Sequence, residues 1–410
     1  MEEQKRVEVI HRVFKGEMTM AEAAMVLGIS ERHSFRIKAR IREEGVKGVV
    51  HGNRGRSCSW KVSEKTEKRI VELARGKYRG FNDHHLTEKL DQEQGIKLSR
   101  EKVRLVLRSQ GIGSPRRRRP PKHRSRRERR EAEGMMVQID GSPHDWLEGR
   151  GPFLCLVGAI DDATSKVGAA FFEEQETSAA YLRLFSEVGK CQGLPQSAYA
   201  DRHSIFWTDR KPTVEEQLAG KRPRTQVGRA LEELGITLIP AGSPQAKGRI
   251  ERLWGTFQDR LVSELRLAGA KSKEQAQVVL DHFLPQHNRQ FAKPAVKTQP
   301  AWRKVDPKSL EQSLCFKYQR VVAKDNTVRF KGAVFQIPKG SPYLSYANKK
   351  IQVHVLLDGA VEFFYQGERI ARFDSETAHT IGLYRTNGRR EVFSYGPDTT
   401  HPALLYELPP

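Results

Sequence analysis

The sequence predicts a multidomain fold, with all-α helix-turn-helix units at the N-terminus, a central α/β domain and a small C-terminal β-barrel. Three observations predict it. Helix-capping residues and helical periodicity dominate the first part of the chain, strands alternate with helices in the middle, and short strands separated by turn residues follow residue 315. The length of 410 residues allows two or three such domains.

The charge is distributed unevenly along the chain. The formal net charge is +22, and residues 1–134 carry 35 basic and 19 acidic side chains, whereas residues 135–270 carry 16 and 18. This imbalance indicates a polyanionic partner, for which we expect nucleic acid. No apolar run approaches the ~18 residues of a membrane span, and residues 1–5 lack the apolar stretch that is typical of a signal peptide. We therefore expect no membrane partner and a cytoplasmic, nucleoid-associated protein.

Four cysteines are present and none forms a CxxC pair. This pattern argues against a disulfide framework and against a structural zinc site.

Residues 1–56 are predicted to be a helix-turn-helix unit. Thr19 and Glu22 fit a capping box, Gly28 supplies a turn, and Ser30 is a suitable N-cap for a second helix. That second helix is basic, as a recognition helix in the major groove would be. We expect three of its side chains to contact DNA, namely Arg32, Arg36 and Arg40.

Residues 57–112 are predicted to form a second helix-turn-helix or winged-helix-like unit. Its last helix is capped by Ser99 and presents Arg100 and Arg104 for DNA binding. Residues 113–134 then form an Arg-rich linker with ten Lys and Arg between residues 116 and 130. Such a segment is expected to be a solvated arm that lies along phosphates, and its DNA-binding candidates are Arg116, Arg117, Arg118 and Arg119.

Residues 135–300 are predicted to be the α/β domain. Strands are expected at 135–140, 153–160, 166–172, 197–200 and 235–240, with a helix capped by Thr177 and another at 225–234. Along the first strand, alternation places Val137 and Ile139 on one face and Gln138 and Asp140 on the other. Three antiparallel strands followed by alternating strands and helices indicate a mixed sheet covered by helices.

Residues 315–375 are predicted to be the small β-barrel, followed by a tail at 376–410. One hairpin is expected to turn at Asp325-Asn326, and a second to turn at Asp358-Gly359.

Three acidic residues of the α/β domain are candidates for catalysis. Asp140 lies on the first strand, Asp201 ends the fourth, and Glu251 lies in a helix expected to follow Pro244. Phosphodiester cleavage by two Mg²⁺ ions needs carboxylate oxygens, and ions ~3.5–4 Å apart stabilise both the attacking and the leaving oxygen. Each acid taken alone is more often ordinary surface charge.

The predicted helix around Glu251 has an apolar stripe of Ile250, Trp254, Phe257 and Leu261. Glu251 sits at the edge of that stripe, with Lys247 and Gln258 flanking it on the same helix face.

Three segments that contain these acids, residues 138–140, 199–206 and 243–252, resemble the three blocks of the DDE integrase core. That core is shared by retroviral integrases and bacterial insertion-sequence transposases, and the chain is most similar to the ISNCY-like group of the latter. The resemblance implies an RNase H-like fold with Asp140, Asp201 and Glu251 as ligands of two Mg²⁺ ions, for which Mn²⁺ would substitute. It also implies that Lys247 lies near DNA phosphate.

Two features depart from the family pattern. Asp201 and Glu251 are 50 positions apart, which is longer than usual, because a segment at 208–224 is inserted between them. The zinc-binding N-terminal domain of retroviral integrases is not expected here, since helix-turn-helix units take its place. The insertion makes Asp209 a rival to Asp201. Asp161 and Asp162 are rivals to Asp140, although we favour turn roles for both.

The resemblance implies a DNA transposase that binds the terminal repeats of a mobile element, cleaves DNA strands and joins 3′-OH ends to target DNA. It would act on DNA as a dimer or higher homo-oligomer. The alternative is a catalytically inactive helix-turn-helix regulator that only binds DNA.

Overall fold

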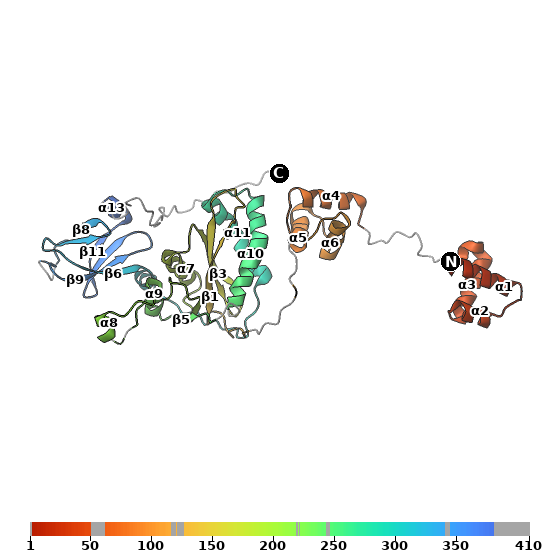
Figure 1. Ribbon diagram of the computed structural model, residues 1–410, viewed down its shortest axis with the longest axis horizontal. Coiled ribbons are helices and arrows are strands. Elements are labelled where there is room, and N and C mark those ends of the chain that lie inside the picture. Colours follow the sequence, from red (N-terminus) through yellow and green to blue (C-terminus); the bar gives the residue numbers. More distant parts are fainter. Residues whose placement is uncertain are drawn as a thin grey trace. The chain divides into compact units, whose positions relative to one another are not determined.

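The fold is that of a computed structural model, which describes residues 2–50, 62–115, 120, 127–218, 220, 222–242, 247–340 and 345–380. The chain divides into two compact units, Met1–Val71 and Glu72–Pro410 (Figure 1). Arg116, Arg117, Arg118 and Arg119 of the predicted arm lie outside the described residues. None of the helices in the described part combines the length and apolar character needed to cross a membrane.

The first unit contains the predicted helix-turn-helix. The Thr19 hydroxyl accepts from Glu22 N at 3.3 Å while Thr19 N donates to Glu22 Oε2 at 2.8 Å, which confirms the capping box. Gly28 ends the second helix in the left-handed region at φ 63°, and Ser30 caps the third by accepting from His33 N at 3.4 Å. The elements are α1 (Glu2–Phe14), α2 (Met20–Leu27), α3 (Glu31–Glu44) and η1 (Gly45–Val49).

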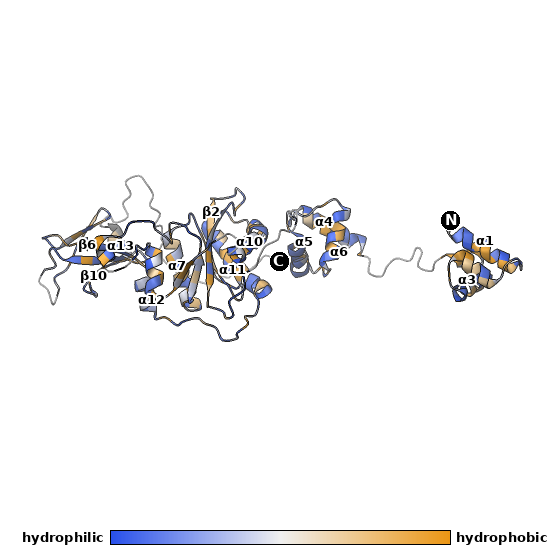
Figure 2. Ribbon diagram, turned by 60° about the horizontal axis from the view of Figure 1, so that its bottom comes forward, coloured by the Kyte–Doolittle hydropathy of each residue, from blue (hydrophilic) through white to orange (hydrophobic). Residues whose placement is uncertain are grey.

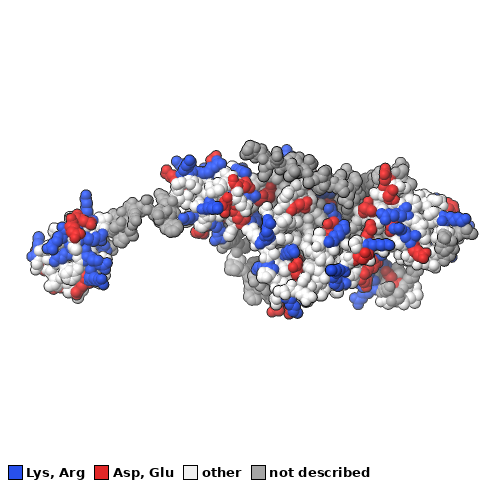
Figure 3. Space-filling view, turned by 180° about the vertical axis from the view of Figure 1, so that it is seen from behind, with Lys and Arg blue, Asp and Glu red and all other residues white. Residues whose placement is uncertain are grey.

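A small apolar core holds this unit together. Ile10 of α1 packs with Ile37 and Ile41 of α3 and with Val49 of η1. The polar side of α3 is left outward, and Lys and Arg cover much of the visible face of this unit in Figure 3.

The second unit is built around a mixed five-stranded sheet. Its strand order is β3-β2-β1-β4-β5, with β1, β2 and β3 antiparallel and with β4 and β5 parallel to β1. This arrangement confirms the predicted α/β domain. The strands are β1 (Val137–His144), β2 (Leu154–Asp161), β3 (Val167–Glu173), β4 (Ser197–Ala200) and β5 (Thr237–Pro240).

Helices cover both faces of this sheet (Figure 1). One core joins Val137 and Ile139 to the helices on the first face, and a second core joins Leu156 and Ile160 to those on the other. Because β2 contributes to both cores, it is buried along its whole length and is coloured as apolar in Figure 2. The covering helices are α7 (Ser178–Cys191) and α9 (Gln226–Glu233) on the first face, and α10 (Gly248–Leu267) and α11 (Lys273–Phe291) on the second.

The helix α10 carries Glu251 and the predicted apolar stripe. The described part of this helix is Gly248–Leu267, and the start expected at Pro244 falls among residues 243–246, which lie outside the described residues. The predicted apolar stripe is confirmed, because Ile250, Trp254, Phe257 and Leu261 are all buried against the sheet.

The predicted second helical unit comprises α4 (Glu64–Arg75), α5 (Asp83–Gln94) and α6 (Arg100–Ser109). The helix α4 crosses the division between the two compact units, whereas α5 and α6 belong to the second. Asn82 caps α5, and Ser99 caps α6 as predicted.

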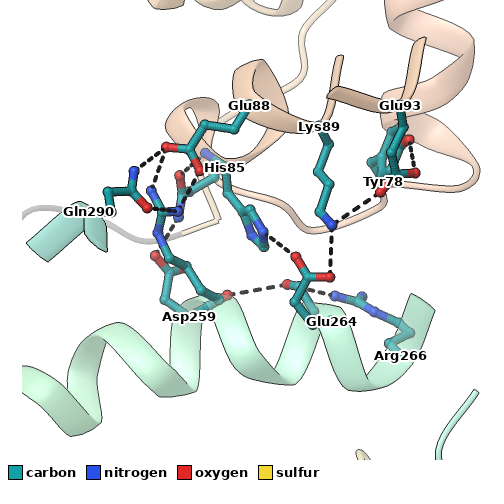
Figure 4. A network of polar contacts seen from close by, with 12 residues as sticks. Tyr78, His85, Glu88, Lys89, Glu93, Asp259, Glu264, Arg266 and Gln290 are labelled. Carbon is teal, nitrogen blue, oxygen red and sulfur yellow. Dashed lines mark hydrogen bonds and ion pairs between the residues drawn. The ribbon is translucent and has the colours of Figure 1, made fainter. Parts of the chain in front are cut away.

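Polar contacts attach α5 to the outer side of α10 (Figure 4). Glu88 accepts from Arg260 Nη1 at 2.6 Å and from Nη2 at 3.1 Å. His85 Nε2 lies 2.6 Å from Glu264 Oε1, and Lys89 Nζ donates to Glu264 Oε2 at 2.9 Å. The helix that carries Glu251 is therefore held by the sheet on one side and by α5 on the other.

The C-terminal part does not form the predicted barrel among the described residues. One sheet has the open order β11-β10-β9-β6, and β7 and β8 form a separate two-stranded sheet. Its elements are α12 (Pro307–Ser313), β6 (Phe316–Val321), β7 (Thr327–Phe330), β8 (Ala333–Gln336), β9 (Lys350–Val355), β10 (Val361–Tyr365), β11 (Glu368–Phe373) and α13 (Ser375–Thr380).

One of the two predicted hairpins is correct. The strands β9 and β10 pair on either side of Asp358-Gly359. The hairpin expected around Asp325-Asn326 is wrong, because β6 pairs with β9 and the tight turn lies at Lys331-Gly332, between β7 and β8. Asp325 forms a local turn instead, accepting from Thr327 N at 3.1 Å.

Candidate active site

The candidate site forms where α10 crosses β1. Three side chains of β1, at alternate positions, contact residues of α10 spaced four apart. Gln138 Oε1 accepts from Ile250 N at 3.3 Å, Asp140 Oδ2 from Trp254 Nε1 at 3.1 Å, and Ser142 Oγ from Gln258 Nε2 at 3.4 Å. Four helical residues advance about 6 Å and two strand residues about 6.6 Å, so the two elements stay in register.

Asp140 lies at the centre of this crossing. Its Oδ1 accepts from Lys247 Nζ at 2.8 Å, and its Oδ2 accepts from the Trp254 indole. The Lys247 side chain is only 8% exposed and that of Asp140 20%. The carboxylate is therefore an enclosed anion that is balanced by one ammonium group.

Asp201 approaches the same ammonium group from the end of β4. Lys247 Nζ lies 3.5 Å from Asp201 Oδ2. The backbone after β4 is held by local bonds, since Asp201 Oδ1 accepts from His203 N at 3.2 Å and the Trp207 indole donates to Asp201 O at 2.9 Å. Two of the three predicted acids, 61 positions apart, thus share one cation.

Glu251 does not join them in this structure. It is exposed in the first turn of α10, and no group of three His, Cys, Asp or Glu side chains in the described part of the chain could hold a metal ion. Its neighbours on the helix nevertheless place the Glu251 side of α10 toward Asp140. Lys247 and Trp254, at i−4 and i+3 from Glu251, both bond to Asp140, and such positions share one helix face.

Burial is the largest influence on the pKa of Asp140. It raises the pKa of this carboxyl, while the Lys247 ammonium and the Trp254 indole N–H act in the opposite direction. An anion kept in a partly dry site attracts a cation more strongly than one in water. The two carboxylates that share the Lys247 ammonium group supply oxygen ligands of the kind that a hard divalent cation prefers.

The three rival acids have other surroundings. Asp161 accepts from Thr164 N, Thr164 Oγ1 and Gly134 N, each at 2.8 Å, and so stabilises the turn after β2. Asp162 is buried among arginine side chains. Asp209 is exposed. None of the three contacts Lys247, whereas Asp140 and Asp201 both do.

The predicted DNA-binding side chains differ in how exposed they are to solvent. Arg32 and Arg36 are exposed on α3, and Arg40 is half-buried there. Arg100 and Arg104 are exposed on α6, where Arg104 pairs with Glu101 at 3.2 Å. Lys247 is buried between two carboxylates.

Sequence reasoning missed the polar role of Trp254. Its place in the apolar stripe predicted only packing, yet its indole N–H orients Asp140. This role could have been inferred from its position three residues after Glu251, on the helix face that lies toward Asp140.

Comparison with known proteins identifies the class. Residues 6–68 match a family model described as a winged helix-turn-helix. A helix-turn-helix unit followed by an α/β domain with paired acids defines a DNA-acting protein. The chain is 33% identical over 396 residues to y4bF of Sinorhizobium fredii, a protein named as a transposase, covering 95% of this chain and 85% of that one.

A second relative supports the same class. The transposase for insertion sequence IS1202 of Streptococcus pneumoniae is 28% identical over 452 residues, covering 99% of this chain and 94% of the relative. The chain therefore belongs to the insertion-sequence transposases, as its sequence resemblance implied.

Solved structures of viral integrases are more distant. The HTLV-2 integrase catalytic core domain in complex with magnesium is 16% identical with a TM-score of 0.27, covering 37% of this chain and 84% of that one. The simian T-cell lymphotropic virus intasome with a PP2A regulatory subunit is 13% identical with a TM-score of 0.31, covering 74% and 99%.

Proposed function

We propose that this transposase cleaves DNA at the terminal repeats of its element and joins the freed 3′-OH ends to target DNA, using Asp140, Asp201 and Glu251. One observation carries the proposal: Asp140 of β1 and Asp201, the residue after β4, share the ammonium group of the buried Lys247. The strand order, with three antiparallel strands and two parallel ones, further supports an RNase H-like core.

The chemistry needs two displacements at phosphorus. In the first, a water oxygen bonds to phosphorus and the P–O3′ bond breaks, which leaves a 3′-hydroxyl and a 5′-phosphate. In the second, that hydroxyl bonds to a phosphorus of the target, and the displaced 3′-oxygen takes up a proton. Bound Mg²⁺, or Mn²⁺ in its place, would activate the attacking oxygen and stabilise the leaving one.

The residues of the chain prepare the site for these steps. Asp140 and Asp201 would provide oxygen ligands, and Glu251 would add a third from the same face of α10. Trp254 holds Oδ2 of Asp140, so that Oδ1 points to the cation position. Lys247, which pairs with both aspartates here, would bind a phosphate of the DNA when a metal ion is held by these acids.

Membership of the insertion-sequence transposases supports a homo-oligomer, because two element ends must be joined to one target. We propose that the helix-turn-helix of the first unit, with Arg32, Arg36 and Arg40, reads the repeats. Arg100 and Arg104 of α6 and the arm with Arg116, Arg117, Arg118 and Arg119 would contact the DNA backbone. A cytoplasmic, nucleoid-associated location follows from this partner.

The test is strand cleavage of end DNA by purified protein with Mg²⁺, resolved on a denaturing gel, beside Asp140→Asn. Wild-type protein should produce a nick at the repeat end and longer joined products, and Asp140→Asn should bind the same DNA without cutting it. If the wild type binds end DNA yet forms no product with Mg²⁺ or Mn²⁺, the protein is an inactive regulator instead.

A further inference from the structure

A buried carboxylate behind the candidate site is bonded by four donors from three parts of the chain. The Asp162 side chain is fully buried. It accepts from the Arg127 guanidinium, from Arg249 Nη1 at 2.8 Å, from Gln138 Nε2 at 2.8 Å and from Arg130 N at 2.9 Å. A buried charge with this many donors is strongly bound to its place.

Two of these donors lead directly to the proposed catalytic acids. Gln138 lies two residues before Asp140 on the same face of β1, and Arg249 lies two residues before Glu251 at the start of α10. Gln138 also accepts from Ile250 N at 3.3 Å through its other amide atom. Asp162 is therefore linked to the first turn of α10 twice, through Arg249 and through Gln138.

The other two donors come from the end of the basic linker. Arg249 Nη2 donates to the Arg127 carbonyl at 3.0 Å, and Arg129 Nη1 donates to the carbonyls of Asp162 and Ala163 at 3.1 and 2.8 Å. Residues 127–130 thus belong to the support of the α/β domain, although their composition predicted a solvated arm. The first turn of α10 rests on the linker as well as on β1.

We propose that Asp162 is a positioning residue, which sets the place of Glu251 relative to Asp140 by holding Gln138, Arg249 and linker residues 127–130 together. The inference rests on the proposed function of Asp140 and Glu251. A purely stabilising role would predict lower stability alone, whereas a positioning role also predicts weaker cation binding at the site.

Asp161 offers a matched control for Asp162. It is the preceding residue, its side chain is also buried, and it accepts three hydrogen bonds, but none of them reaches α10. The full-length variants Asp162→Asn and Asp161→Asn are compared for thermal unfolding, Mn²⁺ binding by EPR and single-turnover cleavage.

Both amide variants should unfold at lower temperature. Only Asp162→Asn should weaken Mn²⁺ binding and slow cleavage by about 10-fold or more, at the low end of the loss seen when residues that orient metal ligands are replaced. Excess Mn²⁺ should restore part of its cleavage. If Asp162→Asn binds Mn²⁺ and cleaves as Asp161→Asn does, the positioning role is wrong.

A second variant keeps the proposal testable if Asp162→Asn does not fold. Gln138→Met preserves side-chain length and leaves Asp162 paired with both arginines, but removes the link to Ile250 N. It should weaken Mn²⁺ binding in the same direction, and wild-type binding in this variant would overturn the inference.

The two proposals fail in distinguishable ways. If Asp140→Asn and Glu251→Gln leave Mn²⁺ binding unchanged, the proposed catalytic site is wrong and the inference falls with it. If these two abolish binding while Asp162→Asn and Gln138→Met match the wild type, only the positioning role is refuted.

Discussion

At the scale of single residues, the three proposed acids should behave as one unit. Amides keep the size of Asp140, Asp201 and Glu251 while removing charge, so Asn or Gln at any one of them should slow cleavage by more than about 100-fold, the upper end for outer-shell partners of a metal site. A double amide variant should be little worse than a single one. Single-turnover cleavage of end DNA measures this.

The exposed rival supplies the control for that series. Asp209→Asn should cleave like the wild type, because this side chain is exposed and does not contact Lys247. Full activity of Glu251→Gln would remove Glu251 from the site, and an inactive Asp209→Asn beside an active Asp201→Asn would exchange the two aspartates.

Lys247 should compete with a bound cation. Lys247→Met leaves the enclosed Asp140 carboxylate without its ammonium partner, so the protein should gain more stability from Mg²⁺ than the wild type does. The measurement is the rise in unfolding temperature on adding Mg²⁺. Lys304→Met, at an exposed position, should show the wild-type rise. An unchanged or smaller rise in Lys247→Met would show that the lysine does not occupy the cation position.

At the scale of elements, the attachment of α5 to α10 can be broken at one residue. Arg260 is 9% exposed and donates to Glu88 through both Nη atoms. Arg260→Met should cost roughly 1–3 kcal/mol of unfolding free energy, because Glu88 is left without a charged partner. Denaturant unfolding measures the loss, and hydrogen exchange should rise in α5 first.

An exposed ion pair serves as the comparison. Arg104→Met removes a pair with Glu101 in which both side chains are about half exposed, so it should cost less than about 0.5 kcal/mol. Equal losses in the two variants would mean that the contacts of α5 with α10 add nothing to stability.

The helix α11 should respond to acid through His287. Burial, aided by the positive charge of Arg260, lowers the pKa of His287 to about 4. The unfolded chain takes up this proton near pH 6.5, so folding stability is lost as pH falls from about 6.5 toward 4. His287→Phe keeps the ring contacts with Phe257 and Phe291 and removes the titration.

The fall in unfolding temperature between pH 7 and pH 5 should therefore be smaller for His287→Phe than for the wild type. It should not vanish, because burial also lowers the pKa of His354 to about 4. The same fall in both proteins would contradict the assignment of His287 as an acid-sensitive group.

Local signals predicted elements well and pairings poorly. The strand at 197–200 matches β4 to the residue, and the caps at Thr19, Ser30 and Ser99 are correct, since these signals act within a few residues. The first C-terminal hairpin was wrong because β6 pairs with β9, some thirty residues further along, and a turn residue such as Asp325 does not specify its strand's partner.

In the candidate site, too, local features could be predicted from the sequence and long-range contacts could not. Periodicity predicted the faces of Asp140 and of the apolar stripe. It did not predict that Lys247 and Trp254 would hold Asp140, because these contacts join residues 107 and 114 positions apart and depend on how α10 lies across β1. The Asp162 cluster likewise depends on three distant segments meeting in one buried place.

At the scale of the whole molecule, DNA affinity should follow the basic charge of the first unit. Replacing Arg32, Arg36 and Arg40 by Ala in the full chain should weaken binding to end DNA. It should also lower the slope of log K against log salt by about 0.9 for each phosphate that the variant no longer neutralises. Fluorescence anisotropy at several NaCl concentrations measures both. An unchanged slope would place the phosphate-binding residues elsewhere, and the catalytic amide variants should bind normally.

The C-terminal sheet is integrated into the second unit rather than appended to it. Arg229 of α9 donates to the Ser313 carbonyl at 3.3 Å, and Gln226 exchanges hydrogen bonds with the Lys317 backbone at 2.9 and 3.1 Å. One apolar core continues from α7 and α9 into β6, β9 and β10. Removing residues 316–410 would therefore uncover part of the α/β domain.

Between Asp201 and Glu251, only the stretch before α9 is free to vary in length, because α9 packs in the apolar core and β5 pairs with β4. Glu251 itself is located by the contacts of Ile250 and Trp254 with β1. The short helix α8 (Val214–Leu218) lies in this stretch, with Val214 71% and Leu218 85% exposed. For protein engineering, α8 is accordingly a place in the α/β domain to insert a fluorescent or affinity label, so that assembly on DNA can be followed without disturbing the contacts between α10 and β1.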